Sequence, residues 1–272
     1  MHKIRFEGEY YKIDAIHLCE PSPQRTPVLY QAGASGRGQA FAGKHAEAIF
    51  AGGPSIKVIR DQVRGIRNEA VVAGRDGNDI KIYTLATAIV AETDGEAQNK
   101  FNDYRRNVQH AAGLTHLSGL TGIDLSAYGL DDVLQHIESD SMRSAVDSFT
   151  SADPDRLWTI RELAEHQSLG GRGPVFVGSP STVADQMMEW MDGADINGFN
   201  LAYVVAHETY KNVVDLLVPE LQRRGVYPTK YPDGTLREKL GARGPHLTAP
   251  HPAQQYSYKN AIAAGNALAS LP

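Results

Sequence analysis

Residues 28–50, VLYQAGASGRGQAFAGKHAEAIF, decide the fold of this chain. Their pattern predicts an apolar strand, a turn of small residues, an amphipathic helix and a second strand. Gly33 stands where the turn must bend tightly, and Ser35 stands where a helix needs an N-cap. Such a turn leaves backbone N–H groups free at a helix N-terminus, where they can bind phosphate. The spacing alone leaves open whether Ser35 binds a ligand or only caps the helix.

The alternation of strands and helices continues along the chain. We expect strands at residues 28–31, 48–51, 80–91 and 198–205, and helices at residues 35–45, 56–73, 96–112, 183–192 and 208–224. This alternation is typical of a parallel sheet covered by helices, so the fold class is α/β. The sequence yields four β/α units, whereas a closed TIM-type barrel needs eight.

Two further segments flank the first of these units. Residues 4–13 alternate around a Glu-Gly-Glu turn and predict a small hairpin. Residues 19–27 hold three prolines and predict an extended connector.

The alternation of strands and helices is interrupted in two later regions. Residues 113–172 are punctuated by glycines and predict an insertion packed over one end of the sheet, with helical patches near residues 131–139 and 159–168. The last part of the chain is rich in proline. We therefore divide the chain into a (β/α) domain at residues 1–226, which the resemblance described below makes part of a barrel, and an extended C-terminal tail at residues 227–272.

The composition excludes several classes of protein. The 272 residues are 42% hydrophobic and 22% charged, as in an ordinary soluble globular protein. A net charge of −5 gives no electrostatic reason to expect nucleic acid or an anionic membrane as a partner. The single cysteine, Cys19, excludes an internal disulfide framework and favours a reducing compartment. The sequence has no apolar run of about 20 residues, the length that spans a bilayer. The segment MHKIRFEGEY has no apolar h-region of a secretory signal. We therefore expect a cytoplasmic protein.

Common catalytic motifs are missing from the sequence. The histidines are dispersed, and no pair has metal-ligand spacing with a third partner, so we expect no metal site. There is no Ser-His-Asp nucleophile elbow and no Walker-type phosphate loop.

The stretch at residues 28–50 resembles the sequence after the fifth barrel strand of flavin-dependent monooxygenases of the bacterial luciferase superfamily. It is most similar to the branch that oxidises nitrilotriacetate, dibenzothiophene sulfone and pristinamycin precursors. The hairpin at residues 4–13 and the Val-Gly-Ser-Pro turn at residues 177–180 add to the resemblance, which covers about residues 4–247. It implies the C-terminal half of a TIM-type luciferase-like barrel, with the insertion at about residues 113–172 characteristic of this superfamily.

The resemblance also implies a flavin site. The residues that match the family's phosphate-binding turn are Gly33, Ala34, Ser35 and Arg37, which would hold the phosphate of FMN. The turn at residues 177–182 matches a second ligand-end turn of the family, but a plain capping motif explains it equally well.

Three positions match substrate-contacting positions of relatives. Phe50 would pack against the flavin or an aromatic substrate, although packing in the core explains it as well. Val177 aligns with an apolar residue that lines the substrate cavity. Leu120 stands where relatives can have a substrate-contacting histidine, which puts the identity of the substrate in doubt.

The activity implied by the resemblance is that of a two-component monooxygenase. Such an enzyme uses O2 and reduced FMN supplied by a separate flavin reductase to oxidise a small organic or xenobiotic substrate. We name no catalytic residue, because in this superfamily those groups come largely from the first four strands. Two alternatives stay open: a non-catalytic half barrel that associates with a partner chain, and an incomplete product without activity. Since a half barrel exposes strand edges and an apolar face, we expect a homo-oligomer or a complementing chain.

Overall fold

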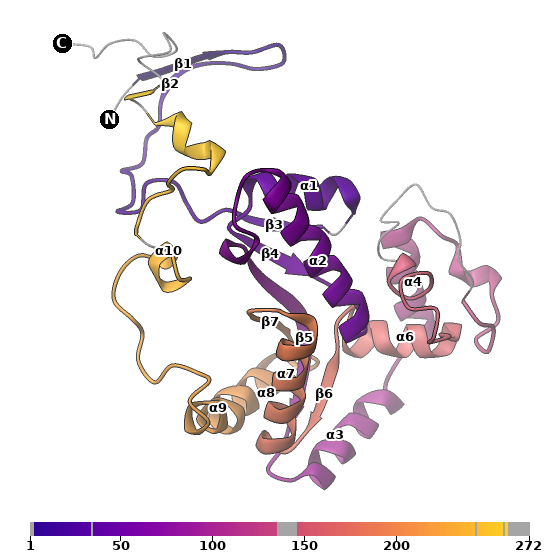
Figure 1. Cartoon of the computed structure of the whole chain (residues 1–272). Helices are drawn as coiled ribbons and strands as arrows, with labels where there is room; N and C mark the ends of the chain where they lie inside the picture. The colour runs from indigo at the N-terminus through magenta and orange to yellow at the C-terminus, as the bar shows by residue number, and fades with distance from the viewer. Residues whose placement is uncertain (1–2, 34, 135–145, 243, 258, 261–272) are drawn as a thin grey trace.

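The computed structural model describes residues 3–33, 35–134, 146–242, 244–257 and 259–260, and its fold is α/β as predicted (Figure 1). Five parallel strands form one sheet: β3 Tyr30–Ala32, β4 Ala48–Ala51, β5 Lys81–Val90, β6 Val175–Gly178 and β7 Gly198–Ala202. The long strand β5 is central, because it pairs with β4, β6 and β7 along different parts of its length. The strand β6 was not among the predicted strands.

Helices follow the strands, as a βα alternation requires. They are α1 Gly36–His45 after β3, α2 Ile56–Val72 after β4, α3 Asp94–Arg106 after β5 and α7 Pro180–Ala194 after β6. After β7 the chain forms α8 Ala206–Asn212, a π-helical stretch Val213–Leu217 and α9 Val218–Arg223, close to the bounds of the predicted last helix. The short 3-10 turn η1 spans Gly77–Asp79. No helix in the described part of the chain is long and apolar enough to cross a membrane.

The two faces of the sheet differ in what covers them. Along β5 the even-numbered residues, among them Ile82 and Ala88, join the apolar core that the helices cover. Because side chains alternate along a strand, the odd-numbered residues Tyr83 and Leu85 point to the opposite face. We call this opposite face the inner face.

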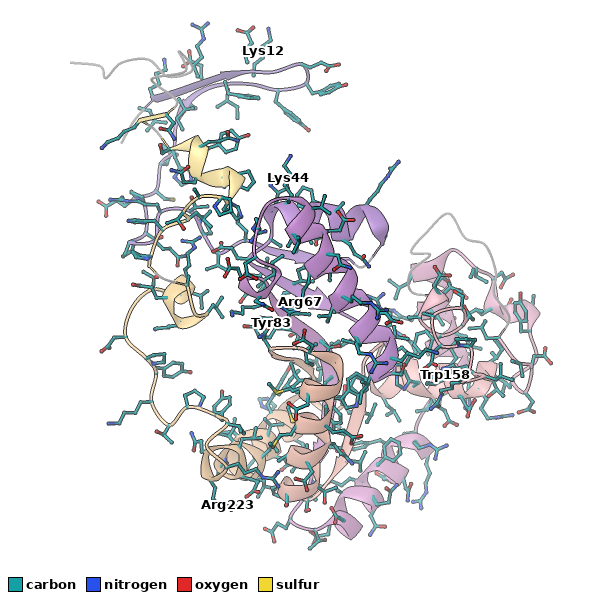
Figure 2. The ribbon with its side chains drawn as sticks, viewed as in Figure 1. Lys12, Lys44, Arg67, Tyr83, Trp158 and Arg223 are labelled. Atoms are coloured by element: carbon teal, nitrogen blue, oxygen red, sulfur yellow. The ribbon has the colours of Figure 1, made fainter. Side chains whose placement is uncertain are left out.

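The predicted hairpin is present, and it is longer than residues 4–13. Strands β1 Lys3–Glu7 and β2 Lys12–Ile16 pair antiparallel, with Phe6 opposite Ile13. The hairpin stands apart from the five-stranded sheet (Figure 1). Figure 2 labels the side chain of Lys12 on this hairpin. Ile4, Phe6 and Ile13 share one of its faces and are all about half exposed.

The segment between β5 and β6 has an apolar cluster of its own. It contains α4 His110–Thr121, η2 Leu125–Ala127 and α6 Ile160–Leu169, so the helical patch predicted at residues 159–168 is confirmed. The cluster is built around buried residues that include Leu125, Phe149 and Trp158. Figure 2 shows Trp158 within this group of helices, beside the sheet.

Two helix predictions in this region were wrong. The expected helix at residues 96–112 is two helices, because α3 ends at Arg106 and α4 begins at His110. The break lets α4 approach α6 closely, since a Cβ at Gly113 would lie 2.8 Å from the Ala164 carbonyl oxygen. Of the patch expected at residues 131–139, residues 131–134 form a turn and a bridge between Val133 and Thr159, and residues 135–139 lie outside the described residues.

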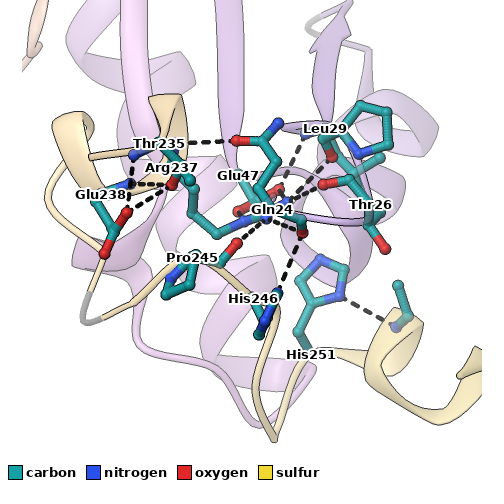
Figure 3. A network of polar contacts seen from close by, with 12 residues as sticks. Gln24, Thr26, Leu29, Glu47, Thr235, Arg237, Glu238, Pro245, His246 and His251 are labelled. Atoms are coloured by element: carbon teal, nitrogen blue, oxygen red, sulfur yellow. Dashed lines mark hydrogen bonds and ion pairs between the residues drawn. The ribbon is translucent and has the colours of Figure 1, made fainter. Parts of the chain in front are cut away.

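The C-terminal segment returns to the sheet. It contains α10 Leu236–Lys239 and η4 Pro252–Tyr256. Arg237 is only 2% exposed, and its guanidinium donates to the Glu47 carboxylate and to the backbone carbonyls of Gln24, Thr26, Pro27 and Pro245 (Figure 3). This network ties the segment around Arg237 to the amino-terminal ends of β3 and β4. The boundary of the domain at residue 226 stays a prediction.

Candidate functional site

The turn after β3 opens at the carboxyl end of the sheet. Gly33 has a φ of +123°, which a residue with a side chain rarely adopts. Ser35 is the N-cap of α1, and its hydroxyl accepts a hydrogen bond of 3.2 Å from the Gly38 N–H. Gly38 must stay small, because a Cβ there would lie 2.9 Å from the Gly33 carbonyl oxygen. The capping role predicted for Ser35 is confirmed.

The first turn of α1 fits a phosphate group. Among the described residues, the N–H groups of Gly36 and Arg37 have no hydrogen-bond partner, and both residues are exposed. The side chain of Arg37 also makes no hydrogen bond or ion pair within the described part of the chain. Ala34 lies outside the described residues. Two free N–H groups, a hydroxyl and a guanidinium at one helix N-terminus are the donors that an anion needs.

Three aromatic rings lie side by side on the inner face. The ring centroids of Tyr30 and Phe50 are 5.2 Å apart, and those of Phe50 and Tyr83 are 6.4 Å apart. Phe50 is 37% exposed and belongs to none of the described apolar core clusters. Burial raises the pKa of the Tyr83 phenol, so this side chain is neutral at ordinary pH. The inner face therefore offers an apolar surface formed by three closely packed aromatic rings.

The other two predicted substrate positions lie on different elements. Val177 is in β6 opposite Ile89, while its neighbour Phe176 packs in the helix-side core. Alternation along the strand therefore places Val177 on the inner face, the same face as Phe50. Leu120 is half-buried in α4, which packs against α6.

The second candidate turn, at residues 177–182, already has a carboxylate of the protein as its hydrogen-bond partner. Ser179 is the N-cap of α7, and its N–H donates to the Asp94 carboxylate over 2.7 Å. This hydrogen bond holds the pKa of Asp94 below its usual value. A carboxylate at the N-terminus of α7 stands where an anionic ligand would otherwise lie, so the geometry favours the capping interpretation of residues 177–182. The role of Asp94 is not visible in the sequence pattern, because its partner is 85 residues away.

The loop after β4 is fastened to the segment between β5 and β6. The hydroxyl of Ser55, the N-cap of α2, donates to the Asp153 carboxylate over 2.7 Å. Lys57 lies 3.0 Å from Asp155 and 3.6 Å from Asp153. These contacts place the segment beside the carboxyl end of the sheet, where the candidate site lies.

Two other features of the described residues do not contribute to this site. A cavity of about 620 Å³ lies at the opposite, amino-terminal end of the strands, lined by Glu47, Arg75, Arg237 and His251 among others. No group of three His, Cys, Asp or Glu side chains within the described residues could hold a metal ion.

A parallel sheet with an open glycine-containing turn and a free helix N-terminus at its carboxyl end is an arrangement that many phosphate-binding α/β proteins use. Comparison with known proteins identifies the family of the chain. The model of the luciferase-like monooxygenase family matches residues 1–195. The chain belongs to this family, and the predicted resemblance is confirmed.

Several curated proteins similar to this chain are monooxygenases. The chain is 41% identical to the dimethyl-sulfide monooxygenase of Hyphomicrobium sulfonivorans over 257 residues, which are 94% of this chain and 54% of the relative. It is 38% identical to the long-chain alkane monooxygenase of Geobacillus thermodenitrificans, with the same coverage. The dibenzothiophene-sulfone monooxygenase of Rhodococcus erythropolis matches as well, at 33% identity over 91% of this chain and 56% of the relative. The chain therefore spans about half the length of these relatives.

Solved structures agree with this assignment. The crystal structure of DmoA from Hyphomicrobium sulfonivorans superposes with a TM-score of 0.83 at 39% identity, over 100% of this chain and 57% of that one. A riboflavin lyase solved with modified FMN and riboflavin gives a TM-score of 0.78 at 36% identity, over 94% of this chain and 56% of that one.

Proposed function

We propose that this chain supplies the FMN phosphate site and part of the cavity wall of a two-component flavin-dependent monooxygenase. In this proposal, reduced FMN comes from a separate flavin reductase, and the substrate is a small organic molecule. The observation that carries the proposal is the turn at residues 33–38, where two N–H groups and the Ser35 hydroxyl lie open at the N-terminus of α1. Family membership connects that turn to a flavin nucleotide.

Each residue of the turn has a role in this proposal. The Ser35 hydroxyl and the N–H groups of Gly36 and Arg37 donate hydrogen bonds to phosphate oxygens, and the α1 dipole favours their negative charge. The Arg37 guanidinium adds a positive charge near the same group. When bound, the flavin supplies the oxygen chemistry, while the protein positions it and excludes water.

The inner face provides the apolar wall of the cavity in this proposal. The Tyr30, Phe50 and Tyr83 rings, together with Val177, form a surface on which a flat ring or an alkyl chain can lie. Phe50 and Tyr30 are 37% and 41% exposed in this chain, so water reaches the surface. We therefore propose that further barrel strands cover the inner face in the active assembly. The exposed hairpin face is proposed as a surface for association between copies of the chain.

The experiment that tests the proposal measures product formed per reduced FMN oxidised. Candidate substrates are aminopolycarboxylates and aromatic sulfones, and hydrogen peroxide is measured in the same reaction. Because oxygenation needs a water-excluding cavity, we expect the chain alone to give hydrogen peroxide and little product. Adding a chain that carries the complementary strands of a relative is expected to raise the ratio. Absence of oxygenation in both arrangements, with FMN bound, would contradict the monooxygenase function.

A further inference from the structure

The segment from Gly170 to Pro174, which leads from α6 into β6, is held tightly against the sheet. A Cβ at Gly173 would lie 2.0 Å from the Leu85 carbonyl oxygen, and one at Gly170 would lie 2.3 Å from Val175 Cγ2. Gly171 has a φ of +62° and lies against the Leu85 side chain, with an ideal Cβ 3.3 Å from Cδ2. A side chain at Gly173 would overlap backbone atoms, and glycine is favoured at residues 170 and 171, so the backbone on both sides of residue 172 has a defined place.

The side chain of Arg172 lies along the inner face. A Cβ built on Gly52 would be 3.9 Å from the Cβ, Cζ and Nη2 atoms of Arg172, so the whole side chain runs across the backbone beyond β4. Gly52 follows Phe50 by two residues, and Leu85 follows Tyr83 by two residues. The period of two along a strand therefore places Arg172 on the same face as the aromatic surface.

The guanidinium of Arg172 has no acceptor among the described residues. It makes no hydrogen bond or ion pair there, although the side chain is partly buried. Burial is the sole cause that lowers its pKa, which means that no neighbouring carboxylate offsets the charge. Arg75 and Arg237, which are the buried arginines of the described residues, are both satisfied, by backbone carbonyls and by Glu47 respectively. The Arg172 side chain is half-buried, so its five donors are partly desolvated and are free to bind an acceptor on a ligand.

We propose that Arg172 binds an oxyanion of a ligand whose apolar body lies on the aromatic surface of the inner face. The planar guanidinium suits a carboxylate or sulfonate, which it can bind through two parallel hydrogen bonds. The inference deepens the proposed function, on which it rests, by giving the substrate class: an organic acid with a flat or apolar body. The electron-rich pyrimidine ring of a reduced flavin has the same acceptor chemistry, and the test separates the two sources.

The test measures binding to the 272-residue chain by calorimetry. The probes are 2-naphthalenesulfonate, its neutral counterpart 2-naphthalenemethanol, and riboflavin reduced under anaerobic conditions. In the Arg172→Gln variant, we expect the affinity for the sulfonate to fall roughly tenfold or more, with the alcohol unaffected. Arg172→Lys should retain part of the affinity, because the charge remains. The control is Arg60→Gln, an exposed arginine of α2 that should behave as the parent chain.

Each outcome decides the proposal. A loss for reduced riboflavin alone overturns the organic-acid substrate class and assigns Arg172 to the flavin. Equal affinity of the parent and Arg172→Gln for the sulfonate and for reduced riboflavin, or no binding of these two probes by the parent, overturns the proposal. Circular dichroism melts of each variant verify that the fold is intact. If the parent binds the sulfonate through Arg172 but does not bind FMN, the oxyanion site stands and the proposed flavin function fails.

Discussion

Arg237 and Glu47 are 190 residues apart in sequence and form a bidentate ion pair in the structure. Arg237 Nε lies 2.6 Å from Glu47 Oε1, and Nη2 lies 3.0 Å from Oε2. The Arg237 side chain is 2% exposed and that of Glu47 is 14% exposed. Glu47 also accepts a hydrogen bond from the Leu29 N–H, so the pair connects the C-terminal segment to the chain entering β3 and β4 (Figure 3).

Breaking this pair should destabilise the fold. In Arg237→Ala, Glu47 keeps a charge without its partner, and four backbone carbonyls lose their donor. We expect the free energy of unfolding in urea to fall by about 3–5 kcal/mol. Arg60→Ala, at an exposed position, should change it by less than about 0.5 kcal/mol. Equal stability of the two variants would show that the C-terminal segment contributes nothing to the sheet.

His166 should make the stability of its region depend on pH. The imidazole packs against the rings of Phe149 and Trp158, and burial lowers its pKa from 6.5 to about 4. Between these two values the unfolded chain binds a proton that the folded chain does not. This contribution to stability is therefore present above pH 6.5 and lost as the pH falls to 4, by up to about 3 kcal/mol.

The measurement for His166 is urea unfolding followed by tryptophan fluorescence from pH 4 to pH 7. His166→Phe should remove most of the slope in this window. His207→Gln, a change at an exposed position, should keep it. A parent chain whose stability is constant across the window would refute the prediction.

The hairpin should drive association between chains. Ile4, Phe6 and Ile13 are 46%, 53% and 52% exposed and lie on one face, while the other face carries the Lys3–Asp14 and Lys12–Glu7 ion pairs. We expect the chain to be dimeric or larger by light scattering at micromolar concentration. Phe6→Glu combined with Ile13→Lys should reduce the mass. Arg5→Gln on the polar face serves as the control, and a monomeric parent chain would rule out this surface.

Local signals predicted most of the fold. Ser35, Ser55 and Ser179 are N-caps at helix starts within a few residues of the predicted ones, and β4 has the predicted bounds. These features depend on neighbours in the sequence, so the pattern was sufficient. The strand β6 was missed because its four residues, VFVG, are too short for periodicity to distinguish from the turn that follows.

Contacts between distant segments could not be predicted. After the break between α3 and α4, Gly113 lies close to Ala164 of α6, and the hydrogen bond from Ser179 to Asp94 spans 85 residues. The place of Arg172 on the inner face likewise depends on Gly52 and Leu85, which lie on two other elements. In each case the deciding partner is remote in sequence, where local pattern carries no information.

The most direct test of the account is calorimetric titration of the chain with FMN and with riboflavin, which lacks the phosphate. If the turn at residues 33–38 holds that phosphate, FMN should bind at least about tenfold more tightly than riboflavin. Ser35→Ala should weaken FMN by about 1.5–3 kcal/mol and leave riboflavin unchanged, because one hydrogen bond to a charged acceptor is lost. Thr159→Ala removes an equivalent N-cap from α6 and should leave both affinities as in the parent chain. Equal affinities for FMN and riboflavin, or an FMN affinity unchanged in Ser35→Ala, would contradict the account and assign Ser35 to capping alone.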